Sequence, residues 1–209
     1  MYLTKNGFAD TRYCGNIALW VLVLLMTFMA QYADLLQSLR YDRQLVAGGS
    51  WWLLFSGHLV HANWPHWALN MAGLGIVAFF FSRYGSPLQW LWVFLMAALF
   101  AGTGVYLFNP ALSSGAGLSA VLHGLFVFGA LHEIRYHPLS GYILLLLLCG
   151  KLAWEFMLGP VTGADTLTGV QVITDAHLYG ALGAAVAIAA MSLYASNRHA
   201  NRTASDAGD

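Results

Sequence analysis

The chain has 209 residues, of which 59% are hydrophobic and only 9% are charged. Soluble domains carry about 25% charged residues, so a chain this poor in charge cannot cover a soluble surface and is predicted to be a membrane protein. The net charge of zero gives no basis for nucleic-acid binding, and Cys14 and Cys149 lack the spacing of a disulfide framework or a zinc site.

The first apolar run, residues 15–33, follows a polar N-terminal segment, 1–14. This run is too long for the core of a signal peptide and lacks a small-residue cleavage site, so it is predicted to be a retained membrane helix. The next segment, 34–64, is a long loop that is rich in Trp and His. Its aromatic content is typical of chain lying in the membrane interface and argues against disorder.

Five more apolar segments follow, at 65–82, 88–107, 117–132, 139–158 and 176–195. A hydrocarbon core about 30 Å thick takes about 20 residues of helix, and the shorter segments are tolerable where neighbouring helices shield them. Pro87 and Pro138 stand where helices are expected to begin, because a missing N–H costs least there. The sequence predicts a polytopic, all-α bundle of six transmembrane helices, although one segment being re-entrant is an alternative.

The Lys and Arg residues indicate the orientation of this bundle. With the N-terminus in the cytoplasm, six of the nine fall inside: Lys5, Arg12, Arg83, Arg135, Arg198 and Arg202. Both termini are therefore predicted to be cytoplasmic, and the tail 196–209 is expected to be disordered. Lys151 lies within the fifth segment, where it can pair with Glu155 one turn later.

Polar residues at membrane depth indicate function, because burying them is costly. Ser119 follows Gly115 and Gly117 at the predicted start of the fourth helix, whose unpaired N–H groups can hold an oxyanion. The alternative is a small residue at a helix–helix contact. His177 opens the sixth segment near the same face and is the usual type of partner for an activated serine. It is otherwise an interfacial histidine, and the nearby Asp175 is expected to point away from it.

A third polar group lies at the start of the second segment. His66 and Asn70 are four residues apart and share a helix face, so both can donate hydrogen bonds to an oxyanion hole together with the N–H of Ser119. The alternative is a metal cluster of His58, His61 and His66. No Asp, Glu or Cys stands near these histidines, so no metal is expected.

These residues resemble the signature of the rhomboid family of intramembrane serine proteases, and the resemblance covers roughly residues 15–195. The family pattern is HxxxxHxxxN in the second helix, GxSG in the fourth and HxxG in the sixth. The matching residues are His61, His66 and Asn70, then Gly117, Ser119 and Ala120, and finally His177 and Gly180.

The resemblance implies a six-helix protease domain that uses no cofactor. It implies a catalytic dyad of Ser119 and His177 without an acidic third member, and an oxyanion hole made by His66, Asn70 and the Ser119 amide. Gly180 would let the sixth helix pack closely on the fourth.

Three features depart from the family pattern. Ala120 replaces the glycine after the serine, and Trp51-Trp52 lack the arginine of the first loop. His123 stands where a tyrosine often stacks under the catalytic histidine, so its titration would couple to the dyad.

The GxSA form and the small size are most similar to rhombosortases, a bacterial branch that processes proteins carrying a C-terminal, Gly-Gly-containing membrane anchor. The implied location is the inner membrane, with the site toward the periplasm. The implied partners are the lipid bilayer and transmembrane substrates with C-terminal anchors.

Two other functions fit parts of the sequence. One is a catalytically inactive rhomboid-like protein that binds membrane clients, which the presence of both Ser119 and His177 disfavours. The other is a metal or proton transporter. It would need ionisable residues across the bilayer, whereas nearly all of them are predicted to lie at one side.

Overall fold

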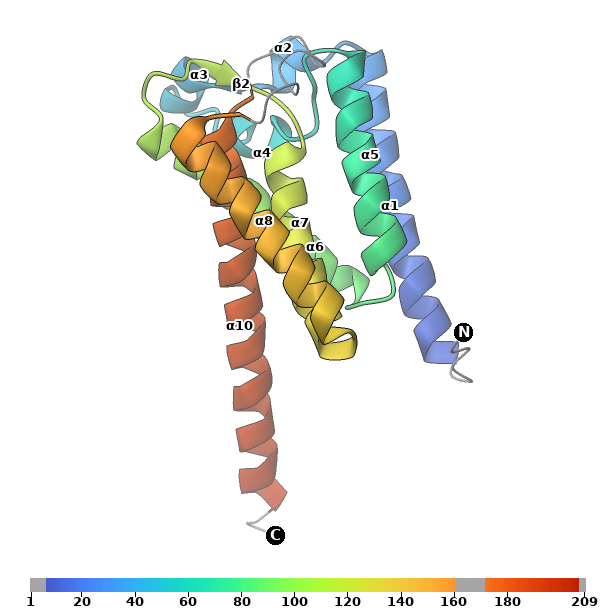
Figure 1. Ribbon diagram of the computed structural model, residues 1–209. Coiled ribbons are helices and arrows are strands. Elements are labelled where there is room, and N and C mark those ends of the chain that lie inside the picture. The colour runs from blue at the N-terminus through green and yellow to red at the C-terminus, as the bar shows by residue number, and fades with distance from the viewer. Residues whose placement is uncertain (1–6, 161–171, 207–209) are drawn as a thin grey trace.

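The computed structural model describes residues 7–160 and 172–206. Six helices of 18 or more residues form a bundle in this part of the chain, and short elements cap one end of it (Figure 1). The six are α1 (Gly7–Tyr32), α5 (Trp64–Phe81), α6 (Pro87–Phe108), α7 (Ser119–Tyr136), α8 (Pro138–Leu158) and α10 (Thr174–Asp206). They correspond closely to the six apolar segments of the sequence.

The cap is the long loop that was predicted to be ordered, and that prediction is confirmed. It contains α2 (Leu36–Leu39), β1 (Tyr41–Asp42), α3 (Arg43–Ala47) and α4 (Leu53–Ser56). Strand β1 pairs antiparallel with β2 (Ser114–Gly115), placing Tyr41 opposite Gly115. This pairing ties the cap to the segment just before α7, and so to Ser119.

The helix starts follow the local sequence. Pro87 and Pro138 are the first residues of α6 and α8, as predicted. Ser86 and Gln89 form a capping box at α6. The side chain of Asn63 accepts a hydrogen bond of 2.8 Å from the backbone N–H of His66, which fixes the first turn of α5.

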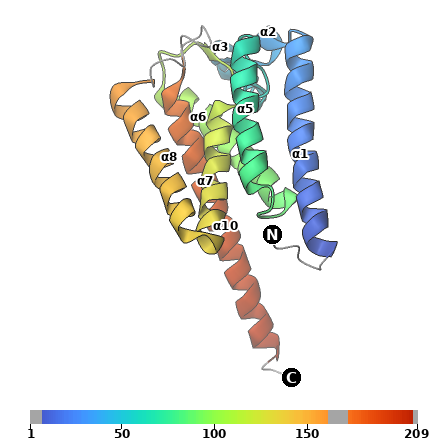
Figure 2. The same ribbon diagram turned by 45° about the vertical axis from the view of Figure 1, so that its right-hand side comes forward.

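Helix α7 is the central element of the bundle, because it packs against α5, α6, α8 and α10 (Figure 2). Close approach of α10 requires glycine at position 180. A Cβ there would lie 2.1 Å from the carbonyl oxygen of Ala120, well inside the contact limit. The small residues therefore set the distance between the two helices that carry Ser119 and His177.

By length and composition, four of the described helices can cross a membrane, which makes the chain a multi-pass membrane protein. They are Thr11–Tyr32, Pro87–Phe108, Pro138–Leu158 and Thr174–Arg198. The predicted count of six spans is not confirmed. Helices α5 and α7 have 18 residues each and carry polar side chains such as Asn70 and His123, which lower their hydropathy.

Helix α1 begins and α10 ends at the same end of the bundle, opposite the cap (Figure 1). The tail 196–209 was expected to be disordered, but α10 continues through Asp206. No Gly or Pro interrupts the chain between Gly183 and Asp206, so nothing in the local sequence ends the helix earlier.

Candidate active site

Ser119 is the first residue of α7, and the backbone before it has a conformation that favours glycine. Gly117 has φ +128°, and a Cβ at this position would lie 2.8 Å from the ring of His66. The N–H of Gly117 donates to the carbonyl of Gly57 in the cap at 2.9 Å. The turn before α7 is therefore held between the cap and α5, with no room for a larger residue.

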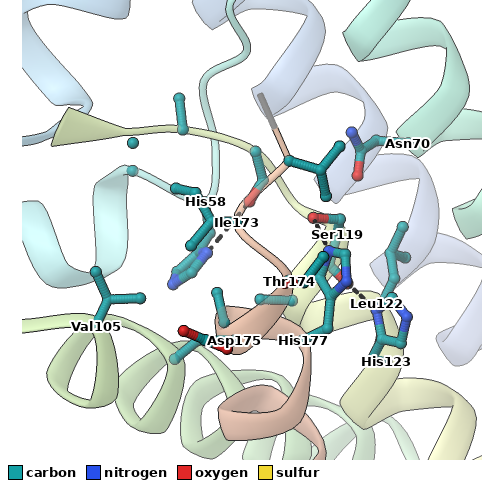
Figure 3. A pocket seen from close by; sticks show the side chains of 18 of the residues that line it. His58, Asn70, Val105, Ser119, Leu122, His123, Ile173, Thr174, Asp175 and His177 are labelled. Carbon is teal, nitrogen blue, oxygen red and sulfur yellow. Dashed lines mark hydrogen bonds between the residues drawn. The ribbon is translucent and has the colours of Figure 1, made fainter. Parts of the chain in front are cut away.

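His177 lies beside Ser119 although 58 residues separate them in sequence. Its Nε2 is 2.9 Å from the Oγ of Ser119, and the imidazole is buried (Figure 3). A serine hydroxyl carries one proton, so it donates to an Nε2 that holds a lone pair. The neutral ring then carries its proton on Nδ1.

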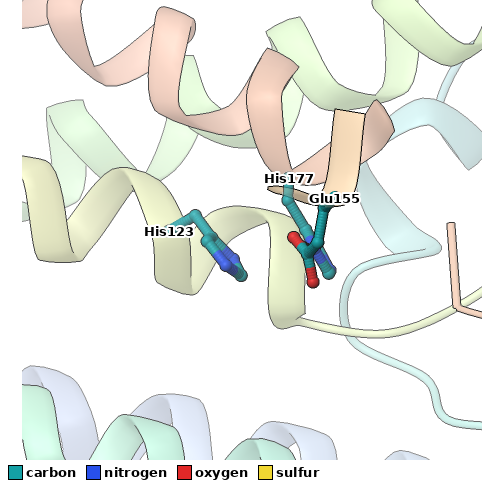
Figure 4. Close-up of side chains that lie close together, drawn as sticks. All are labelled: His123, Glu155 and His177. Carbon is teal, nitrogen blue, oxygen red and sulfur yellow. Dashed lines mark hydrogen bonds and ion pairs between the residues drawn. The ribbon is translucent and has the colours of Figure 1, made fainter. Parts of the chain in front are cut away.

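A carboxylate contacts the other nitrogen of this ring. Oε2 of Glu155, on α8, is 2.8 Å from Nδ1 of His177, and only 5% of the Glu155 residue surface is exposed (Figure 4). The family resemblance implied a dyad without an acidic third member, whereas in the structure a carboxylate contacts His177. Asp175 does face elsewhere, as predicted, and accepts a hydrogen bond from Asn109.

Lys151 completes the polar cluster around His177. Its ammonium is 2.6 Å from Oε1 of Glu155, which confirms the predicted pair one turn apart. The same ammonium is 2.9 Å from Nε2 of His123. Because an ammonium only donates, Nε2 of His123 accepts, and Nδ1–H of His123 donates to the carbonyl of Ser119 at 2.7 Å.

The rings of His123 and His177 are stacked, as the sequence predicted for position 123. His123, Glu155 and His177 also offer ligand atoms within 4.8 Å of one another, a spacing that a metal ion can use. However, the Lys151 ammonium already contacts Glu155 and the outer nitrogen of His123. This arrangement fits an internal ammonium better than a metal ion.

The histidines of the cap and α5 do not form the alternative metal cluster. Both ring nitrogens of His58 lie within hydrogen-bond distance of carbonyls, those of Gly117 and Ala98. His61 packs edge-to-face on His66 with ring centroids 5.2 Å apart. His61 is 1% exposed, and burial, together with the nearby His66, lowers its pKa to about 3. It is therefore a neutral core residue.

The two predicted oxyanion donors lie on α5 across from Ser119. His66 and Asn70 both line the cavity that contains Ser119 and His177. The Asn70 amide donates one N–H to the carbonyl of His66 at 2.9 Å. A primary amide has two such hydrogens, so one remains available to a group in the cavity.

The cavity has a volume of about 990 Å³, and most of its lining is apolar. Its walls include Leu69 of α5 and Leu147 of α8, which are also exposed on the outer surface of the bundle. The cavity around Ser119 is therefore bounded by α5 and α8, and both helices also have side chains on the outer surface of the bundle.

Sequence reasoning missed Glu155 as a neighbour of His177. The available signal was a carboxylate in the middle of an apolar segment, which is costly unless it serves a function. The predicted ion pair with Lys151, one turn away on the same helix, already accounted for a carboxylate at this position. Only the packing of α8 against α10 shows that its second oxygen reaches His177.

A comparison with protein families matches residues 48–194 to the Rhomboid domain. The match covers more than half of the chain, from the residue after α3 into α10, and includes every residue of the polar cluster. No curated protein matches the chain significantly.

Proposed function

This chain belongs to the rhomboid family, and we propose that it is an active intramembrane serine protease whose catalytic pair is Ser119 and His177. The observation that carries the proposal is the 2.9 Å contact between Ser119 Oγ and His177 Nε2 in a largely apolar cavity. A serine with its hydroxyl on an imidazole is the arrangement that nucleophilic catalysis needs.

The reaction begins when a peptide carbonyl of the substrate reaches Ser119. Oγ forms a bond to the carbonyl carbon as its proton passes to Nε2 of His177. The proton then moves from His177 to the leaving amine as the C–N bond breaks, which leaves an acyl-enzyme. Water, or an amine acceptor, attacks the ester while His177 takes the proton of the attacking group and returns it to Ser119.

The oxyanion formed in this reaction needs donors already in place. We assign this role to the Ser119 N–H, His66 and Asn70. The N–H groups at the start of α7 have no partner within the helix, and the dipole of the helix favours negative charge there. Each such donor is worth about 10²–10³ in rate. His61 and Gly117 support them through their contacts with His66.

The proposed substrates are transmembrane anchors cleaved near the outer face of the membrane. The site lies at the capped end of the bundle, opposite the end where α1 begins, and the cavity wall includes surface-exposed residues of α5 and α8. An anchor that enters between these helices must unwind to present its carbonyl. Glycine in the substrate assists, because it weakens a helix by about 1 kcal/mol relative to alanine.

The finer proposal is a rhombosortase-like activity on the C-terminal Gly-Gly-type anchors of exported proteins. It places the chain in the bacterial inner membrane with the site toward the periplasm. Its support is the Gly117-Leu118-Ser119-Ala120 sequence and the small six-helix domain. The alternative, an inactive client-binding protein, does not account for the hydrogen bond between Ser119 and His177.

The test uses a fluorophosphonate probe and a reporter fused to an apolar anchor that is preceded by Gly-Gly. Wild type should be labelled and should release the reporter, whereas Ser119→Ala and His177→Ala should do neither. Ser192→Ala is the matched control, because Ser192 is exposed on α10 and its hydroxyl donates to the carbonyl of Ile188. Full reporter release by Ser119→Ala would show that the proposal is wrong.

A further inference from the structure

We propose that Glu155 is a positioning residue for His177, so that the site works as a Ser119–His177–Glu155 triad whose buried charge is balanced by Lys151. The inference rests on the proposed function and goes beyond the dyad that the family resemblance implies. In this triad Glu155 orients the imidazole of His177, and Lys151 balances the negative charge of Glu155.

Both ring nitrogens of His177 have a hydrogen-bond partner in the site. Nδ1 is 2.8 Å from Glu155 Oε2, and Nε2 is 2.9 Å from Ser119 Oγ. A carboxylate accepts and never donates, so it holds the ring in the tautomer that carries hydrogen on Nδ1. That tautomer leaves the lone pair of Nε2 for the hydroxyl proton, which is what a general base requires.

The charges of the cluster balance before and during the reaction. In the resting state Lys151 is positive, Glu155 is negative and His177 is neutral, so the cluster has no net charge. In the tetrahedral intermediate His177 gains a positive charge while the substrate oxygen gains a negative one. The site is again neutral overall, which matters where burial makes an unbalanced charge expensive.

Glu155 divides its two oxygens between two partners. Oε1 contacts Lys151 at 2.6 Å. Oε2 contacts His177 (Figure 4). A carboxylate that served only the lysine, whose side chain is 40% exposed, would not need burial to 5% against the imidazole. Its burial therefore follows from the contact with His177.

Lys151 also acts on the ring stacked beneath His177. By donating to Nε2 of His123, the ammonium favours the neutral form of that ring, whose other nitrogen donates to the Ser119 carbonyl. A neutral ring does not repel the imidazolium that forms on His177. The Lys151 ammonium thus balances the charge of Glu155 and also favours a neutral His123 beside the imidazolium of His177.

The experiment measures kcat and KM for reporter release by Glu155→Gln, Glu155→Asp and the control Glu133→Gln. Glu133 is a carboxylate of α7 at the opposite end of the bundle, bonded to Tyr84 and Ser140. The amide should lower kcat by about 10²–10⁴-fold, as for the acidic members of other serine protease triads, with KM within about twofold. The shorter Asp should recover part of kcat, and the control should match wild type.

A paired variant guards against misfolding of the single one. Glu155→Gln combined with Lys151→Met removes both charges, so it leaves no unpaired ion and should melt near the wild-type temperature. It should still lose kcat, because His177 then lacks its carboxylate. Wild-type kcat in this double variant would overturn the inference, as would a loss of activity in Glu155→Gln that appears only in KM.

The controls Ser119→Ala and His177→Ala separate this inference from the proposed function. If Ser119→Ala and His177→Ala are inactive while Glu155→Gln is fully active, the dyad stands and Glu155 has no part in the mechanism. Cleavage by Ser119→Ala would instead overturn the proposed function, and the triad with it.

Discussion

The imidazole of His123 stacks on the imidazole of His177, with ring centroids 4.1 Å apart and an interplanar angle of 14°. His123 lies on α7, which also carries Ser119, and His177, whose Nε2 contacts Ser119, lies on α10. The stack limits tilting of the His177 ring about the axis that joins its two hydrogen bonds.

The first prediction concerns this stack. His123→Ala should lower kcat by about 2–10-fold, because an aromatic pair contributes about 0.5–1.5 kcal/mol beyond its buried area. His123→Tyr keeps an aromatic ring and should retain most of the activity. The measurement is kcat for reporter release.

The matched control is His132→Ala, on the same helix but packed against Phe128 and Tyr84 away from the site. Its kcat should equal that of wild type. Equal kcat for His123→Ala and wild type would show that the stack does not position His177.

The second prediction concerns the turn before Ser119. Gly117→Ala should destabilise the protein by about 1–3 kcal/mol, because the new residue must hold a positive φ and its methyl meets the ring of His66. Displacement of Ser119 should also slow fluorophosphonate labelling. Thermal melting and the labelling rate are the two measurements.

Gly75→Ala is the control for this substitution. Gly75 lies inside α5, and a Cβ there meets nothing within 4 Å. Alanine is the better helix former by about 1 kcal/mol, so melting should be unchanged or higher. Equal melting temperatures for Gly117→Ala and wild type would contradict the strain argument.

The third prediction concerns the buried ion pair. Lys151→Met should lower stability by about 1–3 kcal/mol, because it leaves the Glu155 carboxylate without its cation. The same substitution in a Glu155→Gln background should cost much less. The difference between the two costs, from melting in a double-mutant cycle, measures the coupling.

Additivity in this cycle would mean that Lys151 does not stabilise Glu155. Lys151→Arg serves as the conservative control, since arginine retains the positive charge and can reach the same carboxylate. It should melt closer to wild type than Lys151→Met does.

The sequence predicted the helices well, because their signals are local. Pro87 and Pro138 each precede an apolar run and therefore mark helix starts. The apolar run 15–33 is identified as a membrane helix by its length. The polarity of the C-terminal tail predicted disorder, whereas α10 continues through Asp206 in the part of the chain that the structure describes. The six-span count is not confirmed, because α5 and α7 carry polar residues among their apolar ones and are not among the helices apolar enough to cross a membrane by composition.

The site was predictable only in part, for a physical reason. Ser119 and His177 stand out because a serine after glycines and a histidine at a helix start are unusual in an apolar chain. Glu155 also stands out, but its partner depends on the rotation of α8 relative to α10. That rotation follows from side-chain packing between two helices that are separated in sequence, and no local pattern records it.

The last prediction concerns pH and the buried His61 of the cap. The folded protein holds the pKa of this residue at about 3, whereas the unfolded chain has the ordinary value of 6.5. Between these values the unfolded state binds more protons than the folded one, so stability is complete above pH 6.5 and decreases as the pH falls. The loss from this residue alone should be about 2 kcal/mol at pH 5.

Melting temperatures between pH 7.5 and 5 test this prediction. Burial lowers the pKa of His58 as well, so the decrease in wild type does not come from His61 alone. His61→Gln should show a smaller decrease than wild type, because glutamine does not titrate. The exposed residue His137 supplies the control, and His137→Gln should follow the wild-type curve. Parallel curves for His61→Gln and wild type would show that His61 binds its proton equally well in the folded and the unfolded chain, which would contradict the lowered pKa.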